Sequence, residues 1–409
     1  MCSIAKLMAA GVAVMALAGC ATGPTQYQPR TLSVAQQEVV DQKPPSLRPL
    51  YRALFEEGRR NEVLNLMEIG AAAFHLQEYD LARAAFDQAI VNIESVYADN
   101  DAAHRARSLW YEEGEKEFKG EPYERSMVFY YRGLLFLREG DYGNARAAFM
   151  SGLLQDAFAE EEQHATDFAS LIFLAGWAAR LDGNGSLAKQ HFAEYRRLRP
   201  NGPLPDDDDN TLVIAETGSA PRKLADGVGH YQLVYRRGRE IQTQGARLET
   251  AAVSQSLFPI EDVFFQASTR GGRTVDRIIE GKVQFKKSAE ATGDALTSVS
   301  DSSVLAGLST SAGGAVAAGF HTITAIGVAA QGLSARSRTR ADTRYWRRLP
   351  DQIHLTTVRS DPVSNGSRMV FLDADGALMV DRVATIAVHY DGKGNGFAFV
   401  RSTPEGVSP

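Results

Sequence analysis

Cysteine is nearly absent from this chain, with two residues among 409. Two thiols cannot build a disulfide framework or a cysteine-type zinc site. An excess of positive charge is also lacking, because 44 Lys and Arg stand against 50 Asp and Glu, a formal net charge of −6. This balance argues against nucleic acid as the partner.

The short motifs that carry catalysis are missing as well. His-Glu-x-x-His, Gly-x-Ser-x-Gly and Gly-x4-Gly-Lys-[Ser/Thr] do not occur, and the eight His have no metal-ligand spacing. We therefore predict that the chain is not an enzyme and holds no cofactor or metal. A glycan-processing enzyme stays as an alternative, because two catalytic carboxylates can lie far apart in the sequence.

The N-terminus has the pattern of a signal peptide. Lys6 precedes an uncharged apolar run, Leu7 to Ala18, and the small residues end at Leu17-Ala18-Gly19-Cys20. A run of about a dozen apolar residues is too short to span a bilayer and suits a secretory signal. The sequence predicts a signal peptide over residues 1–19.

Leu-Ala-Gly-Cys resembles the lipobox of bacterial lipoproteins. The resemblance implies that Cys20 becomes the first mature residue and carries acyl chains such as palmitate, which anchor the protein to the membrane. Ala21 in place of Asp implies sorting to the bacterial outer membrane, with the protein facing the periplasm. Residues 20–50, rich in Thr, Gln and Pro, are predicted to form a flexible tether.

Residues 51–200 contain a spacing that occurs three times. In each copy a Gly is followed by an Ala twelve positions later and a Phe four positions after that. A Gly in one helix lets the next helix approach, and an Ala and Phe four apart share one helix face. We predict three helical hairpins packed by Gly70, Ala82, Phe86, Gly133, Ala145, Phe149, Gly176, Ala188 and Phe192.

This pattern resembles tetratricopeptide repeats, whose period is about 34 residues. The separations between the three Gly are longer, at 63 and 43 residues, so roughly 29 and 9 residues are inserted. The stretch from Trp110 to Gly133 is also similar to a group of uncharacterised repeat-bearing bacterial lipoproteins. The resemblance implies protein binding on a concave surface.

The first insertion is unusually aromatic. It contains Trp110, Tyr111, Phe118 and Tyr123 among charged residues. We identify these four side chains as candidates for contact with a partner or a glycan. The alternative is that they pack the inserted helix against its neighbours.

Residues 201–210 are predicted to be an acidic linker, because Pro and Gly break the helix and four Asp follow. Residues 211–409 then contain short β-branched or aromatic runs separated by turn signals, which is typical of a mixed domain with a mainly antiparallel sheet. The predicted strands are 211–215, 230–235, 263–267, 282–285, 353–358, 369–372, 383–389 and 396–401.

An Ala- and Gly-rich segment without Asp, Glu, Lys or Arg, residues 304–333, is inserted in this second half. It is predicted to be helical: a buried or hairpin helix, with oligomeric packing or membrane insertion as alternatives. An Arg-rich stretch follows, including Arg336, Arg338, Arg340 and Arg344 near Trp346. It could contact anionic lipid or glycan, or its Arg could pair with nearby acids while Trp346 anchors the core.

The sequence thus predicts an α+β chain with an N-terminal helical array like tetratricopeptide repeats. The expected function is that of a membrane-anchored periplasmic scaffold in envelope secretion or surface-polymer assembly. Its partners would be an envelope protein and the membrane; the oligomeric state stays open. A regulator of peptidoglycan synthesis is the alternative.

Overall fold

The computed structural model describes residues 29–94, 117–157, 168–226, 232–251, 254–268, 342–360, 363 and 366–402. Several predicted features lie outside these residues and stay predictions: the signal peptide 1–19, Cys20, Trp110, Tyr111, Arg336, Arg338, Arg340 and the segment 304–333. Within the described residues, no helix combines the length and apolar character needed to cross a membrane.

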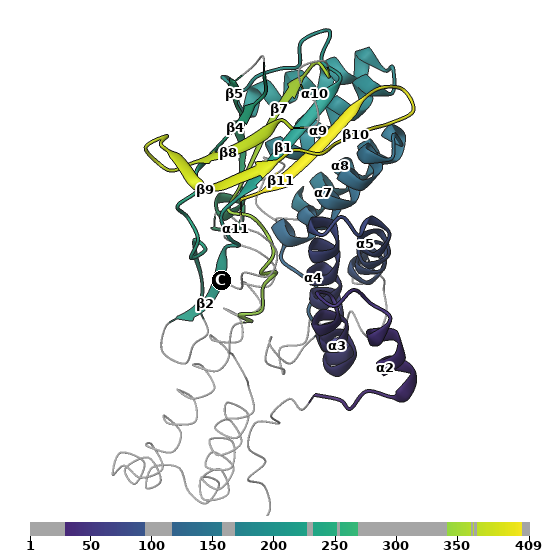
Figure 1. The fold of residues 1–409 in the computed structure, drawn as a ribbon. Helices are drawn as coiled ribbons and strands as arrows, with labels where there is room; N and C mark the ends of the chain where they lie inside the picture. Colours follow the sequence, from purple (N-terminus) through teal and green to yellow (C-terminus); the bar gives the residue numbers. More distant parts are fainter. Residues whose placement is uncertain are drawn as a thin grey trace, which may run out of the picture.

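The described part of the first half is helical (Figure 1). Its elements are α2 (Val34–Asp41), α3 (Arg48–Glu57), the 3₁₀ turn η1 (Gly58–Arg60), α4 (Glu62–His75), α5 (Tyr79–Glu94), α7 (Pro122–Arg138), α8 (Tyr142–Ala157), α9 (Ala169–Leu181) and α10 (Gly185–Leu198). Helices α4 and α5, α7 and α8, and α9 and α10 pack as hairpins, and consecutive hairpins stack on one another. We call these three hairpins the helical array.

The three hairpins turn in the same way. Gln77, Gly140 and Gly183 occupy equivalent positions after the first helix, with φ of 63°, 74° and 80°. The amide of the next residue then donates to the carbonyl five positions back in every turn, as in a Schellman motif. The repeated spacing in the sequence therefore corresponds to a repeated backbone geometry.

The predicted flexible tether does not extend to residue 50. Residues 34–41 form α2 instead, and α3 begins at Arg48. Ser33 caps α2 in a capping box with Gln36, and Val40 and Leu47 are buried. This capped helix explains why a stretch of polar composition is folded.

The second half forms two packed sheets. The five-stranded sheet has the order β10-β11-β1-β7-β6, and the four-stranded sheet has the order β5-β4-β8-β9. Strand β1 runs parallel to β11, and the other described pairs are antiparallel. The strands are β1 (Thr211–Thr217), β2 (Arg222–Asp226), β3 (Gln232–Arg236), β4 (Gly245–Glu249), β5 (Ser254–Ser256), β6 (Phe258–Asp262), β7 (Gln352–Val358), β8 (Arg368–Leu372), β9 (Leu378–Thr385), β10 (Val388–Tyr390) and β11 (Gly396–Arg401). Strands β2 and β3 form a separate hairpin.

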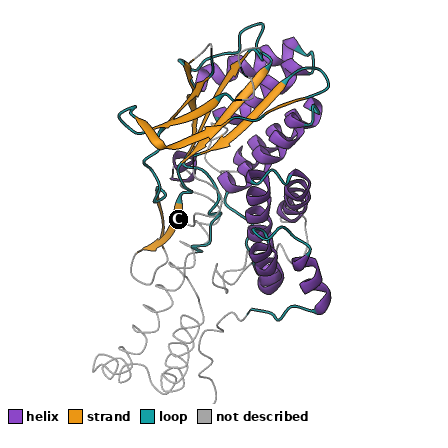
Figure 2. Cartoon of the chain, viewed as in Figure 1, coloured by secondary structure: helices purple, strands orange, loops and turns teal. Residues whose placement is uncertain are grey.

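The five-stranded sheet lies between the helices and the four-stranded sheet (Figure 2). All seven residues of β1 are buried. Leu212 and Ile214 belong to the core shared with the helices, whereas Val213 and Ala215 belong to the core between the sheets. Successive side chains of β1 thus point into different cores, because the residues of a strand alternate between the two faces of its sheet. Burial on both faces explains why β1 is an almost continuous apolar run.

The α+β class and the order of helices before strands are confirmed. The prediction of a strand over 263–267 is wrong, because these residues lie in α11 (Val263–Ser268). The Asp262 carboxylate accepts a hydrogen bond from the Phe265 amide at 2.8 Å, which starts the helical turn. The segment predicted at 383–389 is divided between β9 and β10, and the segment 282–285 lies outside the described residues.

The acidic linker is fixed by one arginine. The Arg180 guanidinium of α9 donates to the carbonyl oxygens of Asp206, Asp207 and Asp209 at 2.6, 2.7 and 3.0 Å. These bonds use the main chain and leave the Asp206 and Asp207 carboxylates exposed to solvent. The linker therefore joins α10 to β1 along a defined path.

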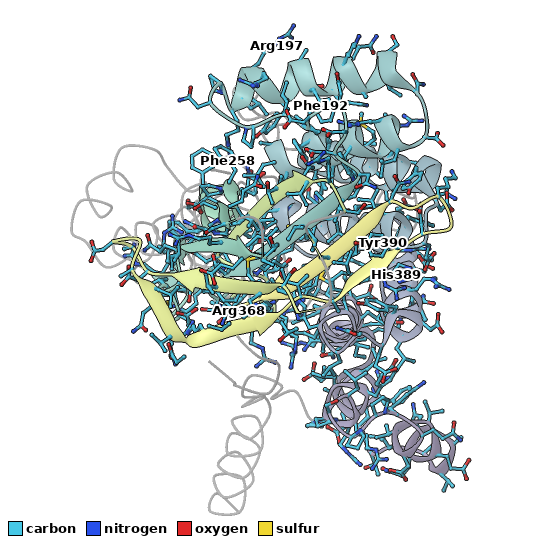
Figure 3. All side chains as sticks on the ribbon, turned by 45° about the horizontal axis from the view of Figure 1, so that its top comes forward. Phe192, Arg197, Phe258, Arg368, His389 and Tyr390 are labelled. Atoms are coloured by element: carbon cyan, nitrogen blue, oxygen red, sulfur yellow. The ribbon has the colours of Figure 1, made fainter. Side chains whose placement is uncertain are left out.

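Helix α10 ends the helical array, and strand β10 lies at an edge of the five-stranded sheet. Figure 3 shows Phe192 and Arg197 on α10, at the end of the array. His389 and Tyr390 lie on β10, an edge strand of the five-stranded sheet, and Arg368 lies on β8 of the other sheet. Phe192 is half-buried, whereas Phe86 and Phe149 are fully buried, as expected for a repeat without a following neighbour.

Candidate binding site on the inner face of the helical array

The first helix of each hairpin, α4, α7 or α9, faces the rest of the chain. Most of the residues in these three helices are buried. We call their side opposite α5, α8 and α10 the inner face. The five-stranded sheet and residues 342–350, which we call the inner segment, cover it.

Trp346 is the centre of the inner segment. Its side chain is fully buried, with ring centroids 6.2 Å from Phe86 and 5.7 Å from Tyr131. Its main-chain amide donates to the Glu124 carboxylate of α7 at 2.7 Å. The segment is therefore held through an aromatic side chain and through its backbone.

Glu124 is a buried acid near the start of α7. Burial raises its pKa to about 7, and the nearby Lys223 ammonium opposes part of this rise. Lys223 itself is buried and contacts Glu121 at 2.7 Å, so burial acts to lower the pKa of its amine while the Glu121 carboxylate raises it above its usual value. This acid–lysine group ties β2 to the start of α7.

Glu68 of α4 holds the next two residues of the inner segment. Its carboxylate is almost completely buried and accepts the Arg347 amide at 2.9 Å and the Arg348 guanidinium at 2.6 Å. Arg344 donates to the Asp342 carboxylate at 2.7 Å and to the Asn61 side-chain oxygen at 2.6 Å. The side chains of Arg344 and Arg348 thus form polar contacts within the chain.

A second buried acid joins the array to the sheet. Glu216 of β1 has no exposed surface and accepts a hydrogen bond from the Tyr131 hydroxyl at 2.9 Å. His75 and Arg401 lie 3.5 Å from the same oxygen. Side chains from α4, α7, β1 and β11 therefore meet at one carboxylate, which fixes the array against the sheet.

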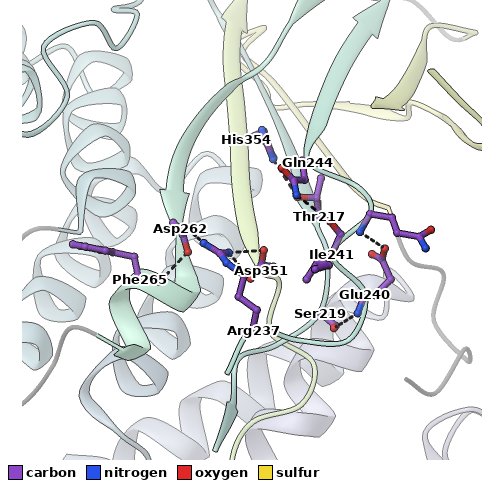
Figure 4. A network of polar contacts seen from close by, with 12 residues as sticks. Thr217, Ser219, Arg237, Glu240, Ile241, Gln244, Asp262, Phe265, Asp351 and His354 are labelled. Atoms are coloured by element: carbon purple, nitrogen blue, oxygen red, sulfur yellow. Dashed lines mark hydrogen bonds and ion pairs between the residues drawn. The ribbon is translucent and has the colours of Figure 1, made fainter. Parts of the chain in front are cut away.

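A further polar network lies at the ends of β6 and β7 (Figure 4). The Arg237 guanidinium donates to both Asp351 oxygens at 2.9 and 2.7 Å and also to Asp262. Burial raises the pKa of Asp351 to about 6, although Arg237 opposes the shift. Since one guanidinium bridges both acids, this network suits a structural joint better than a metal site.

His354 lies in the same region, on the side of β7 that faces the second sheet. Its Nε2 is 3.1 Å from the Thr217 hydroxyl, and burial lowers its pKa to about 4. Within the described residues, no group of three His, Cys, Asp or Glu side chains could hold a metal ion. A small hollow is lined by residues including Tyr142, Trp177 and Asn395.

The structure brings the predicted repeat-packing residues together. A Cβ atom on Gly70, Gly133 or Gly176 would lie 2.5, 2.3 or 2.9 Å from the ring of Phe86, Phe149 or Phe192. Ala82, Ala145 and Ala188 are buried one turn before these rings. The three equivalent contacts agree with the hairpin packing that the spacing predicts.

Four predicted contact residues lie inside the protein instead of on its surface. Phe118, Tyr123 and Trp346 are buried, and the side chain of Arg344 is 13% exposed and paired with Asp342. The packing alternative therefore describes them better. The buried acids Glu68 and Glu124 of the inner face and Glu216 of β1 were not predicted, although an isolated acid in an apolar stretch such as 63–74 is a usable signal.

The chain has no detectable relative in the comparisons with known proteins. No family model matches it, and neither a curated protein nor a solved structure is significantly similar.

Proposed function

We propose that this protein is a lipid-anchored scaffold of the bacterial outer membrane that faces the periplasm. In this proposal Cys20 carries the lipid, and the helical array binds a partner protein in envelope secretion or surface-polymer assembly. The three equivalent hairpins support a protein-binding array of the tetratricopeptide type. The buried joint at Glu216 would keep the array and the sheet rigid against each other.

The observation that carries the proposal is a row of exposed apolar side chains on the outer helices. Val91 of α5 and Leu154 of α8 occupy equivalent positions of consecutive hairpins and are 61% and 55% exposed. Met150, one turn before Leu154, is 39% exposed. Because the chain itself covers the inner face, we take the outer helices α5 and α8 as the surface that a partner contacts.

Affinity capture from solubilised envelopes tests this surface. The tagged full-length protein should recover one defined partner in a stoichiometric complex, and Leu154→Arg should reduce recovery at least tenfold. Val380→Arg is the matched control, because Val380 on β9 is 82% exposed and lies on the other sheet. Equal recovery of the partner by the Leu154→Arg and unmodified proteins would show that the outer helices α5 and α8 do not bind it.

The anchor has its own test. Cys20→Ser should move the protein from the membrane fraction to the soluble periplasmic fraction, because acyl chains supply the attachment. Labelling with radioactive palmitate should be lost in the same variant. A Cys20→Ser protein that stays in the membrane fraction and is still labelled contradicts lipidation at this residue.

A further inference from the structure

The inner segment is held differently from the strands around it. None of residues 342–350, all of which the structure describes, belongs to a strand. The amides of Trp346 and Arg347 donate to the side-chain carboxylates of Glu124 and Glu68, at 2.7 and 2.9 Å. A carboxylate that accepts a main-chain amide does not distinguish between residue types. These two acids can therefore hold any chain that follows the same path, including its turn at residues 347–348.

Selectivity comes from two side-chain positions. The rings of Phe86 and Tyr131 receive the indole of Trp346. Two residues later, the Arg348 guanidinium reaches the second oxygen of Glu68 at 2.6 Å. The resident segment thus fills these two positions with an aromatic side chain and, two residues later, a cation.

The present occupant does not satisfy the site completely. The indole Nε1 of Trp346 is buried and has no hydrogen-bond partner among the residues that the structure describes. A buried donor without an acceptor weakens the retention of the segment that carries it. Since β7 begins at Gln352, release of residues 342–348 would break side-chain bonds, including that of Arg401 to the Arg348 carbonyl, but would unpair no strand.

We propose that Glu68, Glu124 and the rings of Phe86 and Tyr131 form a binding site for a peptide segment that carries an aromatic residue followed two positions later by arginine. The chain's own inner segment occupies this site when no such peptide is bound. The site lies on the inner face, so it is separate from the outer-helix surface of the proposed function.

Fluorescence anisotropy with a labelled peptide of residues 342–350 tests the site. In the detergent-solubilised full chain, Trp346→Ala should weaken the resident segment, and the peptide should bind at least tenfold more tightly than to the unmodified chain. Adding Glu68→Gln to Trp346→Ala should weaken this binding at least tenfold. Glu249→Gln is the matched control, because Glu249 lies on β4 and pairs with the exposed Arg368.

Two results overturn the proposal: no saturable binding to the folded Trp346→Ala chain, or binding that Glu68→Gln leaves unchanged. If circular dichroism shows that Trp346→Ala is unfolded, amide hydrogen exchange of the unmodified chain decides. Millimolar peptide should accelerate exchange at residues 342–349, and unchanged exchange at that concentration overturns the proposal. Leu154→Arg should not alter peptide binding, which separates failure of this site from failure of the outer surface.

Discussion

The ring of Phe149 lies directly on the backbone of Gly133, in the space that any other residue would fill with its side chain. A Cβ on Gly133 would be 2.3 Å from Cε1 of Phe149, well inside van der Waals contact. The same relationship joins Gly70 to Phe86 and Gly176 to Phe192. The helices of each hairpin are therefore as close as they are because one residue lacks a side chain.

Gly133→Ala should destabilise the protein by about 1–3 kcal/mol, since the added methyl group forces the fully buried Phe149 ring to move. Urea unfolding followed by circular dichroism measures the change. Gly143→Ala is the control, because a Cβ there meets nothing within 4 Å and α8 should gain up to about 1 kcal/mol. Equal stability of Gly133→Ala and the unmodified protein would contradict the tight packing.

Glu216→Gln should cost about 3–5 kcal/mol, because it leaves the nearby Arg401 guanidinium without its buried counter-charge. Thermal unfolding is the measurement. Asp208→Asn, which removes an exposed pair with Arg359, should change the stability by less than about 1 kcal/mol. A similar small effect in both variants would mean that Glu216 does not hold the array and the sheet together.

The stability of the protein should depend on pH through Glu261. Burial raises its pKa to about 7 from 4.5, so the folded state binds this proton more tightly than the unfolded state. The resulting stabilisation is present below pH 4.5 and is lost as the pH rises through 7. Glu261→Gln stays neutral, so its stability relative to the unmodified protein should rise by roughly 1–3 kcal/mol between pH 5 and pH 8.

Urea unfolding at both pH values measures this difference. Glu249→Gln, at a carboxylate that pairs with the exposed Arg368, again serves as the control for the substitution itself. His354 acts in the opposite direction, because its pKa is lowered to about 4 and stability is lost as the pH falls below 6.5. Comparing variant with unmodified protein at each pH cancels this second effect. A constant difference for Glu261→Gln would show that this carboxyl is not a source of the pH dependence.

Arg180→Ala should release the acidic linker from α9 by removing the donor to three carbonyl groups. Limited proteolysis with an enzyme that cleaves beside Asp should then cut residues 206–209 at least tenfold faster. Arg359→Ala removes the side chain that pairs with the exposed Asp208 carboxylate, and it should leave the cleavage rate nearly unchanged. Equal cleavage of all three proteins would show that Arg180 does not order this linker.

The parts of the fold that could be predicted are those in which residues close together in the sequence determine the local structure. Gly133 and Phe149 lie in adjacent helices of one hairpin, so their spacing repeats with the hairpin itself. The strands β1, β7, β8 and β11 were predictable for a related reason, since apolar and β-branched residues are concentrated within each. By contrast, Val263 to Ala267 is equally apolar, and its helical conformation depends on the preceding Asp262.

The inner-face site could not be predicted, because its partners are far apart in the chain. Tyr131 and Glu216 are separated by 85 positions, and Glu124 and Trp346 by 222. The helical periodicity predicts that Glu68 and Glu124 lie on helices. It does not predict that residues 346–348 contact them. The side chains predicted as surface contacts, Phe118 and Trp346, are buried by these same long-range contacts.

The pairing of β1 with β11 also sets the order in which the protein can be completed. A chain emerges from the ribosome with its N-terminus first, yet the first strand of the sheet requires as its neighbour a strand that begins at Gly396. Until then, β1 can pair only with β7, and its other edge stays unpaired. Chains that end before β11 should therefore expose an unpaired strand edge in the middle of the sheet, which makes them prone to aggregation.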